Sequence, residues 1–143
     1  MNWKAVWMGA ALLAAAPAAY ALDAQDQGEY VLLNTQEQPT PMQMRFFLSG
    51  EQWMMDGREG QGEWRPVCRG TGECRLVPST GREVARLKAV LPAQWQPHQF
   101  SCIENKALAF CRVQDAAQPN RRAYWWFALV DNQVRALPLN RLR

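Results

Sequence analysis

Four cysteines constrain the fold of this chain more than any other residues do. They stand as two pairs, Cys68 with Cys74 and Cys102 with Cys111, and each pair flanks a short polar stretch typical of a turn. Cysteines that face each other across a hairpin are close enough to form a disulfide. We therefore predict two hairpins, each closed by its own disulfide, although bridges between the two hairpins fit the same sequence.

The start of the chain indicates export. Lys4 precedes an apolar run from Met8 to Ala16, and Ala19-Tyr20-Ala21 then matches the small-residue pattern of a signal-peptide cleavage site. The apolar run is too short to span a bilayer, and the residue after the site is a leucine rather than the cysteine of a lipoprotein. We predict that residues 1–21 are a cleaved secretory signal peptide. Residues 22–143 are then a single exported domain, periplasmic or secreted, in an oxidising compartment where disulfides persist.

Strand signals dominate the rest of the chain. Met42, Met44, Phe46 and Leu48 alternate with other residues at a period of two, which is typical of a strand with one buried face. The most apolar run, 124–130, predicts a strand buried on both faces at the centre of the sheet. These patterns favour a mostly antiparallel sheet.

One segment, residues 80–91, carries a helix signal. Thr80 and Glu83 have the spacing of a capping box, and Val84, Leu87 and Leu91 fall on one stripe. Alternating apolar residues in the same segment also suit a strand. The sequence thus predicts an α+β fold: a mostly antiparallel β-sheet with one short helix, in a single disulfide-stabilised domain.

Two polar stretches are expected to be loops. Residues 56–63 contain three glycines among charged side chains, which predicts a mobile loop. Most of residues 114–122 are polar. We expect them to form a second loop before the apolar strand.

Charge is distributed unevenly along the chain. The net charge is only +3, so we expect no nucleic-acid partner. Residues 22–63 carry two basic and eight acidic side chains, net −6, whereas residues 64–143 carry thirteen basic and five acidic ones, net +8. The two parts either face each other in the fold or present a basic surface to an acidic partner or an anionic envelope polymer.

No catalytic or cofactor motif stands out. His98 is the single histidine and has no serine or cysteine pattern beside it. Acidic residues at 51, 56, 59 and 63 could supply a pair of carboxylates for glycoside hydrolysis, but such residues usually only solubilise a surface. We expect a non-enzymatic protein without a metal or cofactor, and without stable membrane insertion.

The short loop closed by Cys68 and Cys74 is the best candidate for binding, because a preorganised loop loses little entropy when it enters a partner's cleft. Exposed tryptophans beside proline or polar residues can anchor an interface or stack on a sugar ring. The expected partner-binding residues are Arg69, Thr71, Glu73, Trp64 and Trp95. We expect a protein-binding module of the cell envelope, an inhibitor or immunity factor against an envelope-degrading enzyme. The alternative is a glycan- or peptidoglycan-binding protein that uses these tryptophans.

Overall fold

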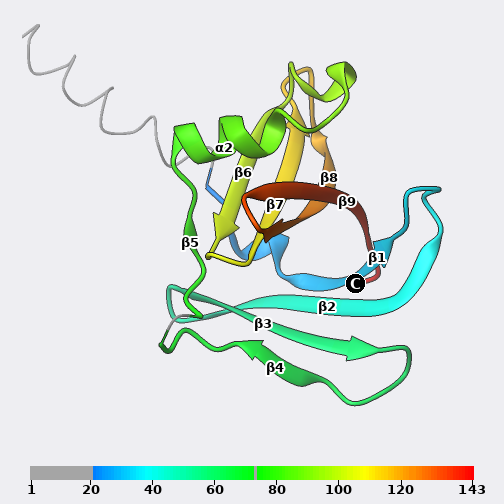
Figure 1. The fold of residues 1–143 in the computed structure, drawn as a ribbon, viewed down its shortest axis with the longest axis vertical. Helices are drawn as coiled ribbons and strands as arrows, with labels where there is room; N and C mark the ends of the chain where they lie inside the picture. Colours follow the sequence, from blue (N-terminus) through cyan, green and yellow to red (C-terminus); the bar gives the residue numbers. More distant parts are fainter. Residues whose placement is uncertain (1–20, 73) are drawn as a thin grey trace, which may run out of the picture.

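The computed structural model describes residues 21–72 and 74–143, and the predicted signal peptide apart from Ala21 lies outside them. Nine antiparallel strands form one sheet in the order β4-β3-β2-β1-β9-β8-β7-β6-β5 (Figure 1). The strands are β1 (Gly28–Leu33), β2 (Pro39–Ser49), β3 (Gln52–Glu59), β4 (Arg65–Cys68), β5 (Val77–Pro78), β6 (Gln99–Glu104), β7 (Leu108–Asp115), β8 (Gln118–Val130) and β9 (Gln133–Arg141).

Helical segments are few in the described residues. One α-helix, α2 (Gly81–Lys88), lies over β6 in Figure 1, and two 3-10 turns occur at Ala24–Asp26 (η2) and Ala93–Trp95 (η3). The mostly antiparallel sheet, the single short α-helix and the two disulfides in one small domain agree with the sequence prediction. With a helix of only eight residues beside nine strands, the α+β label fits the architecture loosely.

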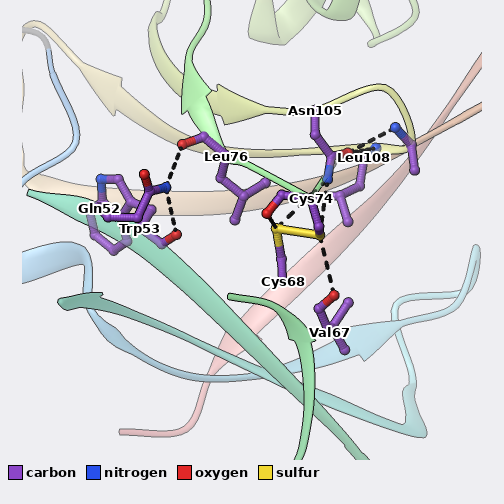
Figure 2. The surroundings of a disulfide bond; sticks show 9 residues. Gln52, Trp53, Val67, Cys68, Cys74, Leu76, Asn105 and Leu108 are labelled. Carbon is purple, nitrogen blue, oxygen red and sulfur yellow. Dashed lines mark hydrogen bonds between the residues drawn. A yellow bond between two sulfur atoms is a disulfide. The ribbon is translucent and has the colours of Figure 1, made fainter. Parts of the chain in front are cut away.

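The sheet curls so that its two ends meet. Trp53 at the start of β3 pairs with Leu76, just before β5, although β3 and β5 stand near opposite ends of the strand order. The side-chain amide of Gln52 donates to the carbonyl of Leu76 at 3.3 Å, at the same junction (Figure 2). The curled sheet encloses one core on its inner face.

The inner core is aromatic at its centre. Phe46 and Phe110 stack with ring centroids 3.9 Å apart, and Tyr30 packs against both of them. These three side chains are at most 1 % exposed. The other buried members are Met44, Trp53, Met55, Cys68, Leu76, Ile103, Leu108, Tyr124 and Leu139. The predicted alternation in β2 places Met44 and Phe46 in this core, while Met42 at the end of the series is 46 % exposed.

A second, outer core lies between α2 and the outer face of β6 to β9. Leu87 of the helix is buried here with Phe127, and Val84 and Leu91 also belong to the cluster, as the predicted helical stripe requires. Thr80 caps the helix: its hydroxyl accepts a hydrogen bond from the N–H of Glu83 at 3.3 Å. The helix ends at Lys88 rather than near residue 91. The helical alternative for residues 80–91 is therefore correct.

Strand β8 contributes to both cores, as predicted for the apolar run. Tyr124 and Trp126 pack on the inner core, whereas Trp125 and Phe127 belong to the outer one. The strand lies inside the sheet, between β9 and β7. Successive side chains of a strand point to opposite faces, which explains this division.

Both disulfides join the cysteines that the sequence paired. Cys102 lies directly opposite Cys111 in the β6–β7 hairpin, with their Cα atoms 4.1 Å apart. Cys68 at the end of β4 is bonded to Cys74 across a short loop. Figure 2 shows the amide of Asn105 reaching this second bridge, where it donates to Cys74 Sγ at 3.6 Å.

Both predicted polar loops are much shorter than expected, with turns only after Glu59 and at residues 116–117. Residues 56–59 belong to β3, whose register pairs Asp56 with Arg45, and the turn is confined to the residues that follow. Residues 118–122 belong to the long strand β8, which pairs with β7 through Gln114 and Arg122. Cross-strand pairing outweighs the low strand propensity of glycine and polar residues in both places.

A buried carboxylate closes one end of the inner core. Asp26 in η2 is completely buried, and it accepts hydrogen bonds from Arg112 Nη1 at 2.7 Å, Tyr124 Oη at 2.8 Å and Arg122 Nη1 at 3.1 Å. The hydroxyl of Tyr30 donates to the main-chain carbonyl of Asp26 at 2.6 Å. Ion pairs and hydrogen bonds thus tie the start of the described chain to β7 and β8.

The two outermost strands of the sheet are short. Strand β4 has four residues and β5 has two, and each includes a proline, Pro66 and Pro78. Their neighbours Val67 and Val77 are 47 % and 44 % exposed. Proline has no N–H, so each outer strand lacks one main-chain donor.

Candidate functional site

The outer face of β2 and β3, which is turned away from the inner core, carries charged and aromatic side chains that contact one another. Arg45 and Phe47 project away from the inner core, because they alternate with Met44 and Phe46, which are buried in it. In the antiparallel register Arg45 lies directly opposite Asp56 of β3. Opposite charges at directly paired positions attract each other across the sheet.

Asp56 organises this face. Its carboxylate is completely buried, and Oδ2 accepts a hydrogen bond from Arg45 Nε at 2.7 Å. The other oxygen, Oδ1, forms an ion pair with Arg69 Nη2 at 2.6 Å, without the angle of a hydrogen bond. The side chains of Arg45 and Arg69 are 38 % and 47 % exposed. One buried carboxylate therefore holds two partly exposed guanidinium groups in place.

Aromatic rings lie beneath the arginines. The guanidinium of Arg45 is 4.8 Å from the ring centre of Trp64, and that of Arg58 is 4.3 Å from the same ring. Arg69 lies over Phe47 at 5.5 Å. Cations at these distances are attracted to the ring faces. We call Arg45, Phe47, Arg58, Trp64 and Arg69 the arginine–aromatic face.

The Cys68–Cys74 loop begins at this face with Arg69. Gly70 and Gly72 have φ values of +79° and +62°, the left-handed region that glycine adopts without strain. A Cβ atom at Gly70 would lie 2.8 Å from Cγ of Gln52, so a larger residue would displace that side chain. The N–H of Gly70 donates to the carbonyl of Cys74 at 3.1 Å, which closes the loop in addition to the disulfide.

A hollow adjoins the face on the side of β1. It has a volume of about 620 Å³, and Glu29, Arg45, Phe47 and Arg143 are among the residues that line it. Arg143 Nε lies 3.4 Å from Glu29 Oε2, an ion pair at its border. The arginine–aromatic face thus continues into a depression that can accept a protruding side chain.

The predicted binding residues fall in different places. Trp64 and Arg69 both belong to the arginine–aromatic face, and Thr71 is exposed in the adjoining loop. Trp95 lies apart on η3, where it packs edge-on against Trp125 of the outer core at 5.5 Å. Glu73 lies outside the described residues. Of the five predicted binding residues, the structure therefore places two, Trp64 and Arg69, in the arginine–aromatic face.

Sequence patterns do not indicate how Asp56 organises the arginine–aromatic face. The glycine-rich composition around Asp56 predicts a loop, and no local motif marks Arg45, Phe47 or Arg58 as site residues. The alternation in β2 already places Arg45 and Phe47 on one face. A two-strand register through the turn at Ser49–Gln52 would have placed Asp56 opposite Arg45.

The acidic residues considered for glycoside hydrolysis do not form the required pair around Asp56. Its carboxylate is buried and engaged by two arginines, whereas an acid catalyst must reach a glycosidic oxygen. Among the described residues, no three His, Cys, Asp or Glu side chains converge in a way that could hold a metal ion.

Comparison with known proteins finds no matching family model, no similar curated protein and no similar solved structure. In the described part of the chain, no helix has both the length and the apolar character needed to cross a membrane.

Proposed function

We propose that this protein is a non-enzymatic binding module of the cell envelope, exported to the periplasm or the medium, which inhibits an envelope-degrading enzyme or confers immunity to it. Its contact surface is the arginine–aromatic face together with the Cys68–Cys74 loop. The partner presents acidic side chains to the arginines and an apolar or aromatic contact to the rings.

One observation carries this proposal: buried Asp56 holds Arg45 and Arg69 over aromatic rings while both guanidinium groups stay partly exposed. Side chains that are already ordered lose less entropy on binding. Arginine and tryptophan are also the residues that most often dominate the binding energy of protein interfaces. Both disulfides are compatible with the oxidising compartment that the proposal assumes.

Glycan binding is the alternative function. The ring of Trp64 already lies under Arg45 and Arg58, at 4.8 and 4.3 Å, so a stacked sugar would have to share that ring with two guanidinium groups. A protein carboxylate, in contrast, gains from the same arrangement because arginine binds it in a bidentate manner. This difference favours a protein partner.

The test compares two matched double variants. Arg58→Ala with Trp64→Ala removes part of the face but leaves both ion pairs of Asp56 in place. Arg121→Ala with Trp95→Ala makes the same chemical change at another site, where Arg121 and Trp95 line a separate pocket. Both variants first have to show a cooperative melting transition.

Immobilised wild-type protein is used to capture partners from an envelope extract, and the captured protein is then purified and titrated. We expect to recover one wall- or membrane-degrading enzyme in stoichiometric amount. The wild-type protein should lower the rate of the reaction that this enzyme catalyses. The Arg58/Trp64 variant should bind it at least about tenfold more weakly, and the Arg121/Trp95 variant should match the wild type. Sedimentation with peptidoglycan that is lost in either variant, with no enzyme recovered, would replace the proposal with the glycan alternative.

A further inference from the structure

A polar pocket of about 620 Å³ lies away from the arginine–aromatic face. It is bordered by the first half of α2, the turn between β6 and β7, and the turn between β8 and β9. Its lining includes three acidic and three basic side chains, namely Glu83, Glu104, Asp131, Arg75, Arg86 and Lys106. The pocket thus offers both signs of charge to one ligand.

Glu104 is the innermost charged group of this pocket. It is the last residue of β6 and is only 9 % exposed, and its Oε1 atom has no hydrogen-bond partner among the described residues. A buried acceptor without a donor costs free energy, and a ligand that supplies the donor recovers it.

The carboxyl groups of Glu104 and Glu83 lie close enough together for each to shift the pKa of the other. Burial raises the pKa of Glu104, and the hydrogen bond to Glu83 raises it further. The hydrogen bond from Glu104, followed by that from Thr80, lowers the pKa of Glu83.

Glu83 and Glu104 are better placed to bind the ammonium group of a ligand than to act as catalytic carboxyls. The ammonium group carries three N–H donors and a positive charge, enough to reach both carboxylates and the unpartnered oxygen of Glu104. Arg86 lies on the same helix as Glu83, one turn further on, and Lys106 lies in the β6–β7 turn. These cations can bind a carboxylate of the same ligand.

We propose that this pocket binds a zwitterionic amino-acid group, either a free amino acid or the end of a short peptide. The ammonium occupies the Glu83–Glu104 pair, and the carboxylate is held by Arg86 and Lys106. At pH values where Glu104 is protonated, its proton competes with the ligand ammonium, so binding there releases that proton to solvent. The proposal is independent of the protein-binding function above.

Other groups around Glu104 affect its titration. Glu83 and Arg86 face it from α2, Ser79 precedes the helix, and Lys106 and Asp131 border the pocket from the two turns. Arg75, before β5, completes the border. Affinity should rise with pH through the titration of Glu104, because the competing proton becomes scarcer.

The experiment titrates the purified protein with alanine, lysine and glycylglycine by calorimetry. The best of these probes is then compared with its N-acetylated and its amidated derivative, which lack the ammonium and the carboxylate respectively. We expect both derivatives to bind at least about tenfold more weakly than the parent. Titrations in two buffers of different ionisation enthalpy should show proton release, most clearly at a pH where Glu104 is still protonated.

Three variants complete the test. Glu104→Gln preserves the shape of the protonated side chain and should lose both the binding and the proton release, and Arg86→Gln should weaken binding about tenfold. Glu51→Gln, which removes an exposed carboxylate elsewhere, is the matched control and should bind as the wild type does. If Glu104→Gln melts early, Glu83→Gln replaces it. The proposal is overturned if none of the probes binds with a dissociation constant below about 10 mM, or if the N-acetylated derivative binds as well as its parent. It is also overturned if Glu104→Gln, or Glu83→Gln in its place, retains full affinity.

Discussion

At the scale of single residues, two carboxylates are completely buried and paired with arginines. Asp26 and Asp56 are both completely buried, and each is engaged by two arginines. A buried charge is tolerated when it is paired and hydrogen-bonded, and removal of one partner leaves the other unpaired. Conservative changes at these positions should therefore be far more damaging than changes at exposed acids.

The first prediction concerns Asp26→Asn. The substitution removes the charge that neutralises Arg112, whose side chain is only 3 % exposed, at a distance of 2.7 Å. We expect a loss of about 3–5 kcal/mol in the free energy of unfolding, measured by urea denaturation. Glu51→Gln, at an exposed position, should change that free energy by less than about 0.5 kcal/mol. A similar small change for Asp26→Asn would contradict this account of the buried cluster.

The second prediction concerns pH and Glu104. Because burial and then the contact with Glu83 raise its pKa, the folded protein holds this proton more tightly than the unfolded chain does. The resulting stability is present below the ordinary glutamate pKa and is lost as pH rises through the raised value. Glu104→Gln cannot lose a proton, so its stability relative to the wild type should increase over that range.

Denaturation of both proteins at pH values from about 4 to 8 measures this difference. The lowered pKa of Glu83 acts in the opposite sense, since its contribution is lost as pH falls; because Glu104 is the largest cause of that lowering, the substitution also reduces this contribution at the acidic end of the range. A constant difference between wild type and variant across the range would show that Glu104 titrates normally.

At the scale of elements, α2 contributes to stability through its buried stripe. Leu87 is 1 % exposed in the outer core, whereas Val90, just after the helix, is 46 % exposed. The helix is too short to be stable alone, so packing rather than propensity has to hold it in place.

The third prediction compares these two positions. Leu87→Ala should lower the free energy of unfolding by about 2–5 kcal/mol, because it leaves a cavity between helix and sheet. Val90→Ala should change it by less than about 0.5 kcal/mol. Equal effects of the two substitutions in urea denaturation would argue against docking of α2 through Leu87.

The sequence correctly predicted those elements whose pattern lies within one short segment of the chain. The pairing of Cys102 with Cys111 follows from the symmetry of one hairpin, and the cap at Thr80 from a four-residue motif. Pairing between distant segments was not predictable in this way. Asp56 and its neighbours resemble a loop until β2 is placed beside them, and nothing local indicates that Leu76 pairs with Trp53.

The residues of the candidate site divide in the same way, into those that a local pattern indicates and those that only strand pairing brings together. Arg69 and Trp64 were identified because they stand beside a disulfide and a proline in the sequence. Their relationship to Arg45 depends on the register of β2 with β3 and on the buried charge of Asp56. Such a site has to be assembled from three strands before it can be recognised.

At the scale of the whole molecule, the inner and outer cores share the same strands. In β6 Cys102 belongs to the outer core and Ile103 to the inner one, and Phe110 and Cys111 divide in the same way in β7. Neither core can come apart without loss of strands that the other needs.

The fourth prediction is a single cooperative unfolding transition with intact disulfides. Far-ultraviolet circular dichroism reports the sheet, and tryptophan fluorescence reports both cores, through Trp53 in the inner one and Trp125 against the outer one. Their midpoints should coincide, as in other small domains that unfold in two states. Trp53→Phe and Trp125→Phe identify how much of the fluorescence change each of these rings contributes, and fluorescence and dichroism midpoints that differ would show that the cores unfold independently.

The short outer strands affect how copies of this protein behave at high concentration. An exposed sheet edge is a template for intermolecular strand pairing and hence for aggregation. Here β4 and β5 are only four and two residues long, and Pro66 and Pro78 remove a donor from each. The exposed valines beside them, Val67 and Val77, therefore lie on short edges that are poor templates for a ladder with a second molecule. The chain can leave apolar side chains at its sheet margins without promoting fibril growth there.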